Sequence, residues 1–286
     1  MAIDSTELVG PAPARPLAGC TVSDRWIVCA AYGPQSGALL TTGRYTVFDA
    51  DAGTDGEAIG AWSGLGDTIT SFCELGGAAW TGTNGNLHRI GVDGSLTTWA
   101  IPGASSIYNV RVAATSAGRI WCLWDKYLSE FNPSSEMFGT AVTIATDRFA
   151  IERVGSVLYL FGSTKVDKHS ASDGSLISTI TPGSSMGFNT TAVIDGDIWW
   201  GDGTKVRRYR TATDTLSSVE TGVTVGYRPA KRTSDGLIYL VQGTTVHTVD
   251  PATMWAATDT LPTSRANRYS AFSARGRVYM PSGAPY

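Results

Sequence analysis

The side chains of this sequence best suited to proton transfer are its three histidines, His88, His169 and His247. Imidazole has an ordinary pKa close to neutral pH, so a histidine is the first candidate for a general acid or base. No nucleophile elbow, phosphate-binding loop or zinc-binding helix motif accompanies these histidines, and no Ser-His-Asp order is present. We therefore expect structural roles for them, and we predict no catalytic residue.

An acidic stretch offers a different chemistry, because Asp49, Asp51, Asp55 and Glu57 bring four carboxylates into nine residues. Calcium-binding loops use similar spacing, since a hard cation needs several oxygens from one tight turn. Gly53, however, stands where the calcium-loop pattern needs an oxygen ligand. A solvated turn is favoured, calcium binding is the alternative, and no metal site is predicted.

The four cysteines, Cys20, Cys29, Cys73 and Cys122, lack the C-x-x-C spacing of a zinc site. Three of them stand in apolar runs, which favours small buried side chains. Cys20 and Cys29 are equally far from a turn at Asp24-Arg25, so a cross-strand disulfide is the alternative for this pair. A reducing compartment disfavours such a bond.

A feature suited to ligand binding is an aromatic residue beside a polar one, repeated about every 40 residues. Arginine binds carboxylates through paired hydrogen bonds, and aromatic faces with Asn or Arg also suit sugars. The alternative is that these positions are solvated strand ends or pair with Glu74 and Glu152. The predicted ligand-binding ring comprises Tyr108, Asn109, Arg148, Asn189, Tyr227, Arg228 and Arg268.

The elements that must position these residues follow from an internal repeat. A turn followed by a short apolar run with an aromatic recurs six times at intervals of about 40 residues. A weaker, earlier copy covers Arg25–Val28. Pairs such as Asp195-Gly196 precede the run and are typical of type I′ hairpins, which need positive φ at both central residues. The aromatics are Trp80, Trp121, Tyr159, Trp199, Tyr239 and Tyr279.

Each repeat is interpreted as four short strands, of which the second is apolar on both faces, as at Ile120–Leu123. The third strand is more polar, as at Lys205–Tyr209, and it carries all three histidines. Four-stranded units of about 40 residues are typical of propeller blades. We predict an all-β fold, a single β-propeller over residues 1–286 with seven four-stranded blades, six being the alternative. Trp199 and Tyr239 are expected to fill the wedges between blades.

The last repeat is incomplete, because only six residues follow its second strand. Outer strands must then come from elsewhere. We assign residues 1–17 as an N-terminal closing segment, with Ala2 to Val9 pairing in the last blade, and residues 18–286 as the blades. A neighbouring chain or an open edge is the alternative.

Composition excludes several classes of protein. Only 16% of residues are charged, 33 of 286 are glycine, and the formal net charge is −3. The chain has no basic footprint for nucleic acid and no apolar run long enough to span a bilayer. The first 17 residues lack the basic start and apolar stretch of a signal peptide. We expect no nucleic-acid binding and no membrane insertion.

The stretch Gly77–Pro102 contains a Gly-x-x-Trp strand, a Leu-His-Arg-Ile strand, an Asp-Gly turn and a closing strand that ends in proline. This blade resembles those of streptogramin-lyase-type and NHL-type propellers. The resemblance implies blades but not a chemistry, because propellers serve many functions. The lyase would require a histidine, a glutamate and magnesium, whereas the histidines here fall on predicted third strands, away from the axis.

The Gly-, Ser- and Thr-rich texture and the unfinished blade resemble minor tail proteins of phages that infect actinobacteria. This resemblance implies a non-enzymatic virion tail protein that contributes to tail-tip assembly or host-surface binding. Such a protein is made in the host cytoplasm without a signal peptide and needs no cofactor. Its predicted partners are other tail proteins or a host-surface glycan, and a homo-oligomer is a further option. The alternatives are a cellular lectin-like propeller and a propeller lyase or hydrolase.

Overall fold

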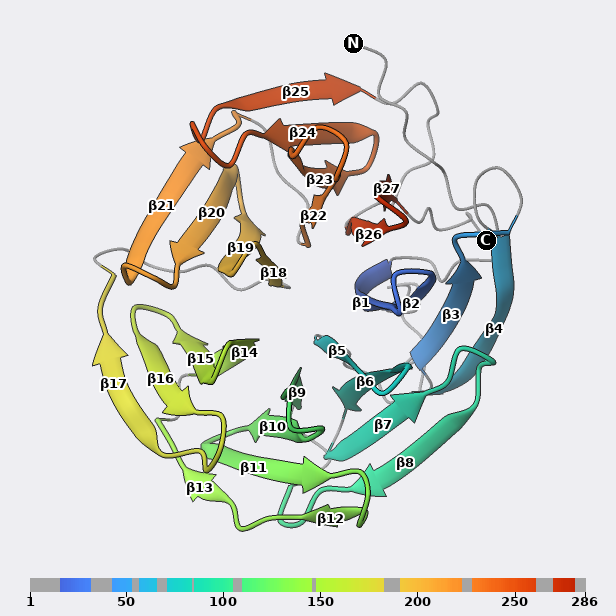
Figure 1. Ribbon diagram of the computed structural model, residues 1–286, viewed down its shortest axis with the longest axis vertical. Coiled ribbons are helices and arrows are strands. Elements are labelled where there is room, and N and C mark those ends of the chain that lie inside the picture. Colours follow the sequence, from blue (N-terminus) through green and yellow to red (C-terminus); the bar gives the residue numbers. More distant parts are fainter. Residues whose placement is uncertain are drawn as a thin grey trace, which may run out of the picture.

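The chain forms a ring of small antiparallel sheets in the computed structural model (Figure 1). The structure describes residues 16–31, 43–52, 57–65, 71–83, 85–104, 110–145, 148–182, 191–222, 228–260 and 270–280. Within these ranges, no helix has the length and apolar character needed to cross a membrane. The predicted all-β propeller is confirmed.

Six sheets are blades in which consecutive strands pair from the axis of the ring outward (Figure 1). The first three blades are β1 (Pro16–Val22), β2 (Trp26–Ala31), β3 (Gly43–Asp49) and β4 (Glu57–Leu65); β5 (Phe72–Leu75), β6 (Ala78–Thr83), β7 (Asn86–Ile90) and β8 (Leu96–Ala100); and β9 (Arg111–Ala114), β10 (Ile120–Trp124), β11 (Tyr127–Asn132) and β12 (Met137–Phe138), with β13 (Val142–Thr143) also pairing with β11. The next three are β14 (Arg148–Val154), β15 (Val157–Gly162), β16 (Val166–Ser170) and β17 (Leu176–Ile180); β18 (Ala192–Ile194), β19 (Asp197–Asp202), β20 (Lys205–Arg210) and β21 (Thr215–Glu220); and β22 (Ala230–Lys231), β23 (Ile238–Gln242), β24 (Thr245–Val249) and β25 (Ala256–Thr260).

The predicted positive φ at both central residues is found in some of the turns between first and second strands, whereas others, such as Ala117-Gly118, have it only at the glycine. Asp195 and Gly196 have φ of 52° and 81°, and Gly76 and Gly77 have φ of 61° and 71°. Positive φ at both central residues matches the right-handed twist of the flanking strands, so these turns join strands tightly. Each blade therefore starts with its innermost strand, at the axis, and its later strands lie progressively farther out.

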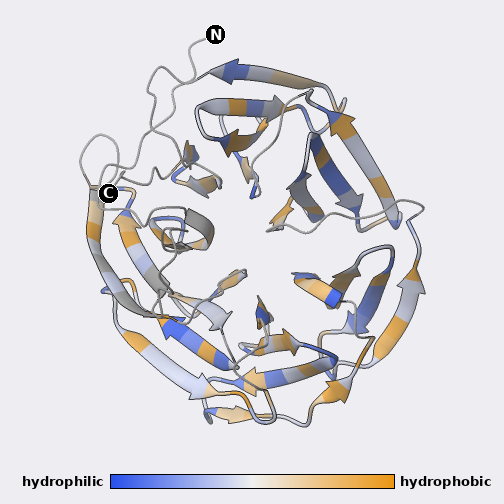
Figure 2. Ribbon diagram, turned by 180° about the vertical axis from the view of Figure 1, so that it is seen from behind, coloured by the Kyte–Doolittle hydropathy of each residue, from blue (hydrophilic) through white to orange (hydrophobic). Residues whose placement is uncertain are grey.

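Burial follows the predicted order of the strands. All five residues of β10 are buried, because this second strand packs against neighbours on both faces. The third strands are more hydrophilic, most clearly β7, β16 and β20 (Figure 2).

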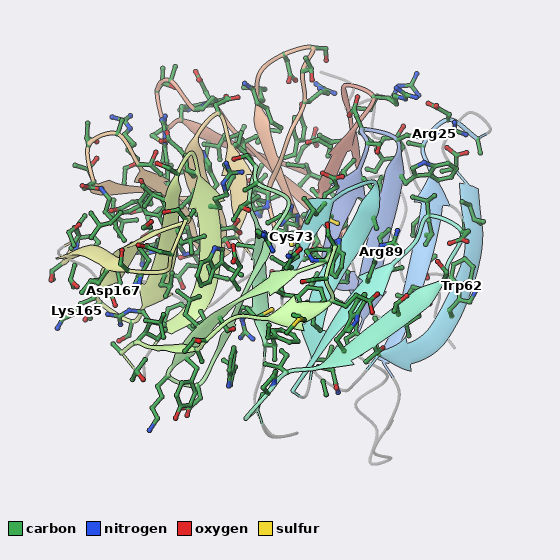
Figure 3. The ribbon with its side chains drawn as sticks, turned by 60° about the horizontal axis from the view of Figure 1, so that its bottom comes forward. Arg25, Trp62, Cys73, Arg89, Lys165 and Asp167 are labelled. Carbon is green, nitrogen blue, oxygen red and sulfur yellow. The ribbon has the colours of Figure 1, made fainter. Side chains whose placement is uncertain are left out.

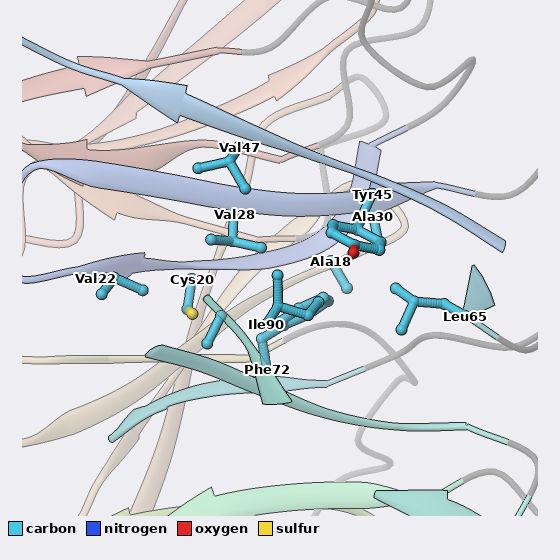
Figure 4. Packing of buried hydrophobic residues seen from close by; sticks show 11 residues of the cluster. Ala18, Cys20, Val22, Val28, Ala30, Tyr45, Val47, Leu65, Phe72 and Ile90 are labelled. Atoms are coloured by element: carbon cyan, nitrogen blue, oxygen red, sulfur yellow. The ribbon is translucent and has the colours of Figure 1, made fainter. Parts of the chain in front are cut away.

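Each gap between neighbouring sheets is filled by a hydrophobic cluster of its own. Between the first two blades, Tyr45 and Phe72 pack with aliphatic residues of β1, β2 and β3 (Figure 4). Trp199 packs with Ile238 and Leu240 of the next blade, and Tyr239 is in a cluster with Ala271 and Val278, near the end of the chain. The prediction that Trp199 and Tyr239 fill the wedges is thus confirmed. Because the hydrophobic core lies in the gaps between neighbouring sheets, the side chains that face the axis of the ring are available for a role other than core packing.

A two-stranded sheet, β26 (Phe272–Ala274) and β27 (Arg277–Tyr279), occupies the remaining position in the ring (Figure 1). It lies between the sixth blade and the first. The described residues therefore contain six blades, five of four strands and one of five, and one shorter sheet; six is the number given as the alternative above. The predicted closing segment, Ala2 to Val9, lies outside the described residues.

The ring closes where this short sheet meets the first blade. Thr21 Oγ1 donates a hydrogen bond of 2.7 Å to the carbonyl oxygen of Ser273. Phe272 and Tyr279 pack with Ile27 and other first-blade side chains in a shared apolar cluster. Sequence-distant strands are therefore joined by both polar and apolar contacts, which fixes the positions of the inner strands around the axis.

Candidate functional site

The candidate site is a channel of about 380 Å³ at the axis of the ring. Its volume is within the roughly 300–1,000 Å³ range of small-molecule sites. The innermost strand of every sheet contributes to the wall, together with residues that immediately precede β22 and β26. The lining residues are Cys20, Thr21, Phe72, Cys73, Glu74, Ala113, Ala114, Glu152, Arg153, Ala192, Val193, Ile194, Arg228, Pro229, Ala230, Ala271, Phe272 and Ser273.

Arg228 lies in the channel wall two residues before β22. Its backbone carbonyl accepts a hydrogen bond of 3.0 Å from the amide of Ala271, and it forms a parallel bridge with Ser270. Its Nη1 donates a hydrogen bond of 2.6 Å to the carbonyl oxygen of Thr191 in the fifth blade. The guanidinium carbon lies 5.9 Å from the centre of the Phe272 ring. Three neighbouring sheets thus hold this one arginine.

Glu152 of β14 lies near Arg228, and Thr191 stands between them. The Thr191 hydroxyl donates to Glu152 Oε1, while the Thr191 carbonyl accepts from Arg228. Burial raises the pKa of Glu152, an effect opposed by the Thr191 hydrogen bond and the charge of Arg228. Burial likewise lowers the pKa of the Arg228 guanidinium. Both shifts show that the channel wall disfavours uncompensated charge.

The other ionisable groups in the wall have partners or stay neutral. The Glu74 carboxylate accepts a hydrogen bond of 3.1 Å from the amide of Gly77. Arg153 donates to the carbonyl of Gly155 at 2.7 Å and to Ser116 Oγ at 2.9 Å. Burial raises the pKa of Cys20 to about 12, so this thiol is protonated at neutral pH and is a poor nucleophile.

Arg148, a member of the predicted ring, is enclosed in its own blade. It is not among the channel-lining residues, and its Nη2 lies 2.7 Å from Asp167 Oδ2. Asp167 belongs to the third strand, β16 (Figure 3), and its other oxygen accepts a hydrogen bond of 2.6 Å from Thr179 on β17. The side chains of Arg148 and Asp167 are only 2% and 6% exposed. The arginine thus links the first strand of the blade to the third.

Of the predicted ring, the structure places Arg228 in the channel and Arg148 inside a blade. The remaining five predictions, Tyr108, Asn109, Asn189, Tyr227 and Arg268, lie outside the described residues. Thr191, which connects Arg228 to Glu152, was not predicted as a site residue. The sequence signal for Thr191 is its place two residues after the predicted Asn189 and immediately before β18.

The three histidines lie within third strands, as the repeat predicts. His88 Nε2 is 2.7 Å from Thr83 Oγ1, and His88 Nδ1 is 2.9 Å from Thr98 Oγ1. Burial lowers the pKa of His88 to about 4, so its imidazole is neutral at physiological pH. His169 Nδ1 and His247 Nδ1 also have hydrogen-bond partners, the Gly174 carbonyl and Thr258 Oγ1. None of the three lines the channel.

His88 and His247 belong to a series of buried polar side chains that sequence reasoning did not recognise as a whole. In the second to sixth blades, the equivalent third-strand position is buried and hydrogen-bonded within its blade, chiefly toward the fourth strand. The sequence signal for this series is that polar residues recur at one position of the third-strand motif, at intervals of about 40 residues. The series is His88, Ser129, Asp167, Arg207 and His247.

The aspartates at the acidic turn after β3 form ion pairs with arginines. Arg25 contacts Asp49 at 2.6 Å, and Arg275 contacts Asp51 at 2.7 Å, across the junction between the first blade and the short sheet. Bonds to these arginines lower the pKa of both carboxyls. Asp55, the third carboxylate of the calcium alternative, lies outside the described residues.

The strand register rules out the alternative of a Cys20–Cys29 disulfide. Cys20 lies opposite Val28, and Cys29 lies opposite Gly19. A shift of one residue points the two side chains to opposite faces of the sheet. Cys20 accordingly packs toward the second blade and Cys29 toward the short sheet, and all four cysteines are free.

Comparison with known proteins supports the architecture. No family model matches the sequence, nor does any curated protein. Among solved structures, the chain is similar to selenomethionine-substituted virginiamycin B lyase from Staphylococcus aureus, with a TM-score of 0.57 and 10% identity over 75% of this chain and 77% of that one. A likeness at this level of identity shows the fold alone, and that fold is a β-propeller.

Proposed function

We propose that this chain is a non-enzymatic binding module, a propeller that receives a ligand at its axial channel and serves in a virion tail. The observation that carries the binding role is the position of Arg228. It is a channel-lining arginine held by three sheets, and its guanidinium contacts a backbone carbonyl and an aromatic ring. A fixed guanidinium facing a channel is suited to recognition.

The histidines argue for binding over catalysis. The whole sequence contains only three, and each is buried in a third strand with a hydrogen-bond partner. Histidine, the most common general base, is therefore used here for hydrogen bonds inside the blades. Sequence texture supports the tail assignment, because low-charge strands rich in Gly, Ser and Thr are typical of all-β tail proteins. Host-surface binding or tail-tip assembly would then be the biological role.

The tail assignment is tested by mass spectrometry of purified virions. We expect peptides of this chain in intact particles, in a constant ratio to those of the major tail protein. Their absence from particles, with abundant peptides in the lysate, would overturn the assignment. Neighbouring genes give a rapid check, because a tape-measure or tail-assembly gene is expected beside this one.

A propeller lyase or hydrolase is the second candidate, and one observation favours it. Glu152 faces the channel with a raised pKa, as a general acid or base often does. The two functions differ in the expected effect of Glu152→Gln. An enzyme would lose turnover, whereas a binding module would retain its ligand.

A further inference from the structure

The channel contains a cation whose charge is not balanced by direct contact. Within the described ranges, no carboxylate lies within 4.0 Å of the Arg228 guanidinium, and its one hydrogen bond goes to the carbonyl of Thr191. Arg148, at the start of inner strand β14, by contrast holds Asp167 at ion-pair distance. A partly desolvated guanidinium with no acid in direct contact is less stabilised than one in an ion pair, and the nearby Glu152 is separated from it by Thr191. An anionic ligand would supply that direct contact.

The guanidinium is fixed before any ligand arrives. The backbone of Arg228 is bonded to Ala271, its Nη1 to Thr191, and its cationic group lies beside the Phe272 ring. A carboxylate that approaches from the channel would meet donors already oriented. Preorganisation of this kind reduces the entropy lost on binding.

Each of the two channel carboxylates has a hydrogen-bond donor of its own, and burial favours the neutral form of Glu152 by raising its pKa. Glu152 accepts a hydrogen bond from the Thr191 hydroxyl, and Glu74 accepts one from the Gly77 amide. The wall nearby is formed by small residues, including Ala113, Ala192 and Ala271. Space of about 380 Å³ with one anchored cation suits a compact molecule that presents a carboxylate.

We propose that the channel binds a small carboxylate-bearing ligand, free or as the end group of a glycan, with Arg228 as the residue that holds the carboxylate. This inference rests on the proposed binding function and specifies its ligand class. It assigns separate roles to the predicted ring residues that the structure describes, since Arg228 contacts the ligand and Arg148 stabilises a blade.

The test is a titration of the full chain with two carboxylates and their neutral counterparts. Calorimetry or NMR would measure binding of acetate against acetamide and of glucuronate against glucose. We expect at least one acid to bind saturably and its neutral counterpart to bind at least about 10-fold more weakly, the effect of one charge-assisted hydrogen bond. A glucuronate-terminated oligosaccharide then distinguishes a free acid from a glycan end group.

Matched variants identify the group responsible. Arg228→Ala should weaken binding of the acid at least about 10-fold. Arg153→Ala should change it by less than about twofold, because Arg153 lines the same channel but donates to Gly155 and Ser116. If Arg228→Ala does not fold, Arg228→Lys is measured, and loss of the forked donor should still weaken binding.

Three results would overturn the inference. They are failure of both acids to bind, equal binding of an acid and its neutral counterpart, and unchanged affinity in the folded Arg228 variant. Binding of a neutral ligand independently of Arg228 would refute the carboxylate inference while leaving a binding module intact. Absence of the chain from virions would refute the tail role while leaving the carboxylate site intact.

Discussion

Arg148 and Arg228 each lie at or just before the start of an inner strand, yet their surroundings differ. Arg148 reaches a buried carboxylate on the third strand of its own blade. Arg228 donates to a backbone carbonyl of the neighbouring blade and remains in the channel wall. The same residue type near the start of an inner strand thus serves stability in one blade and is available for recognition in another. In the fourth blade the third strand supplies an acid, Asp167, whereas no carboxylate of the described residues forms an ion pair with Arg228.

The largest expected effect concerns Arg148. Arg148→Ala leaves Asp167 buried without its cation, and its side chain is only 6% exposed. We expect the free energy of unfolding to fall by about 3–5 kcal/mol, measured by urea denaturation. Replacing both partners should cost less than replacing Arg148 alone. If the single variant were as stable as the wild type, Arg148 would have no structural role of this kind.

The second effect concerns Arg228 and separates binding from stability. Arg228→Ala should lower the free energy of unfolding by about 1.5–3 kcal/mol, less than Arg148→Ala, because it loses one charge-assisted hydrogen bond to Thr191. The same variant should lose at least about 10-fold in affinity for a carboxylate. Urea denaturation and calorimetry on one preparation check both values. A loss of stability as large as that of Arg148→Ala would remove the distinction between the two arginines.

The third effect is a pH dependence that arises from Glu152. Burial raises its pKa above the ordinary value of 4.5, so its contribution to stability is complete at pH below the unfolded value and is lost as pH rises through the folded pKa. Above that pH, Glu152→Gln should therefore be more stable than the wild type.

Ligand affinity should follow the same titration. As Glu152 ionises with rising pH, a second negative charge faces the carboxylate ligand, and affinity should fall. Glu74, Arg153 and Arg228 are the other charged groups of this wall. Glu152→Gln should abolish the component of the pH profile that depends on Glu152. Calorimetric titrations across the pH range check this, and an unchanged profile would exclude Glu152 as its source.

The smallest effect is that of Arg153. Its guanidinium is bonded to Gly155 and Ser116 at the exposed end of the blade, so Arg153→Ala should change carboxylate affinity by less than about twofold. A large loss in this variant would mean that general positive charge, and not the geometry of Arg228, attracts the ligand.

The architecture could be predicted from the sequence because it repeats. Turn pairs such as Asp195-Gly196 and buried runs such as Ile120–Trp124 recur about every 40 residues, and each indicates a strand position independently of the rest. The site could be predicted only in part. The partner of Arg148 is 19 residues away in sequence on a strand that is not its neighbour, so the pattern did not reveal the pair.

The sequence pattern also could not determine the pairing register of two strands to within one residue. Equal spacing from a turn suggested that Cys20 faces Cys29, but the β1–β2 hairpin pairs Cys20 with Val28. A turn displaced by one residue reverses the faces of a strand, and the pattern of apolar residues in β1 and β2 does not fix that displacement. The role of Thr191 likewise depends on two side chains from different blades.

A crystal structure of the full chain with glucuronate in the channel would test the central claim most directly. The account predicts the carboxylate within hydrogen-bond distance of the Arg228 guanidinium, with Arg148 still paired to Asp167. Glucuronate bound elsewhere, or bound in the channel with its carboxylate turned away from Arg228, would contradict it.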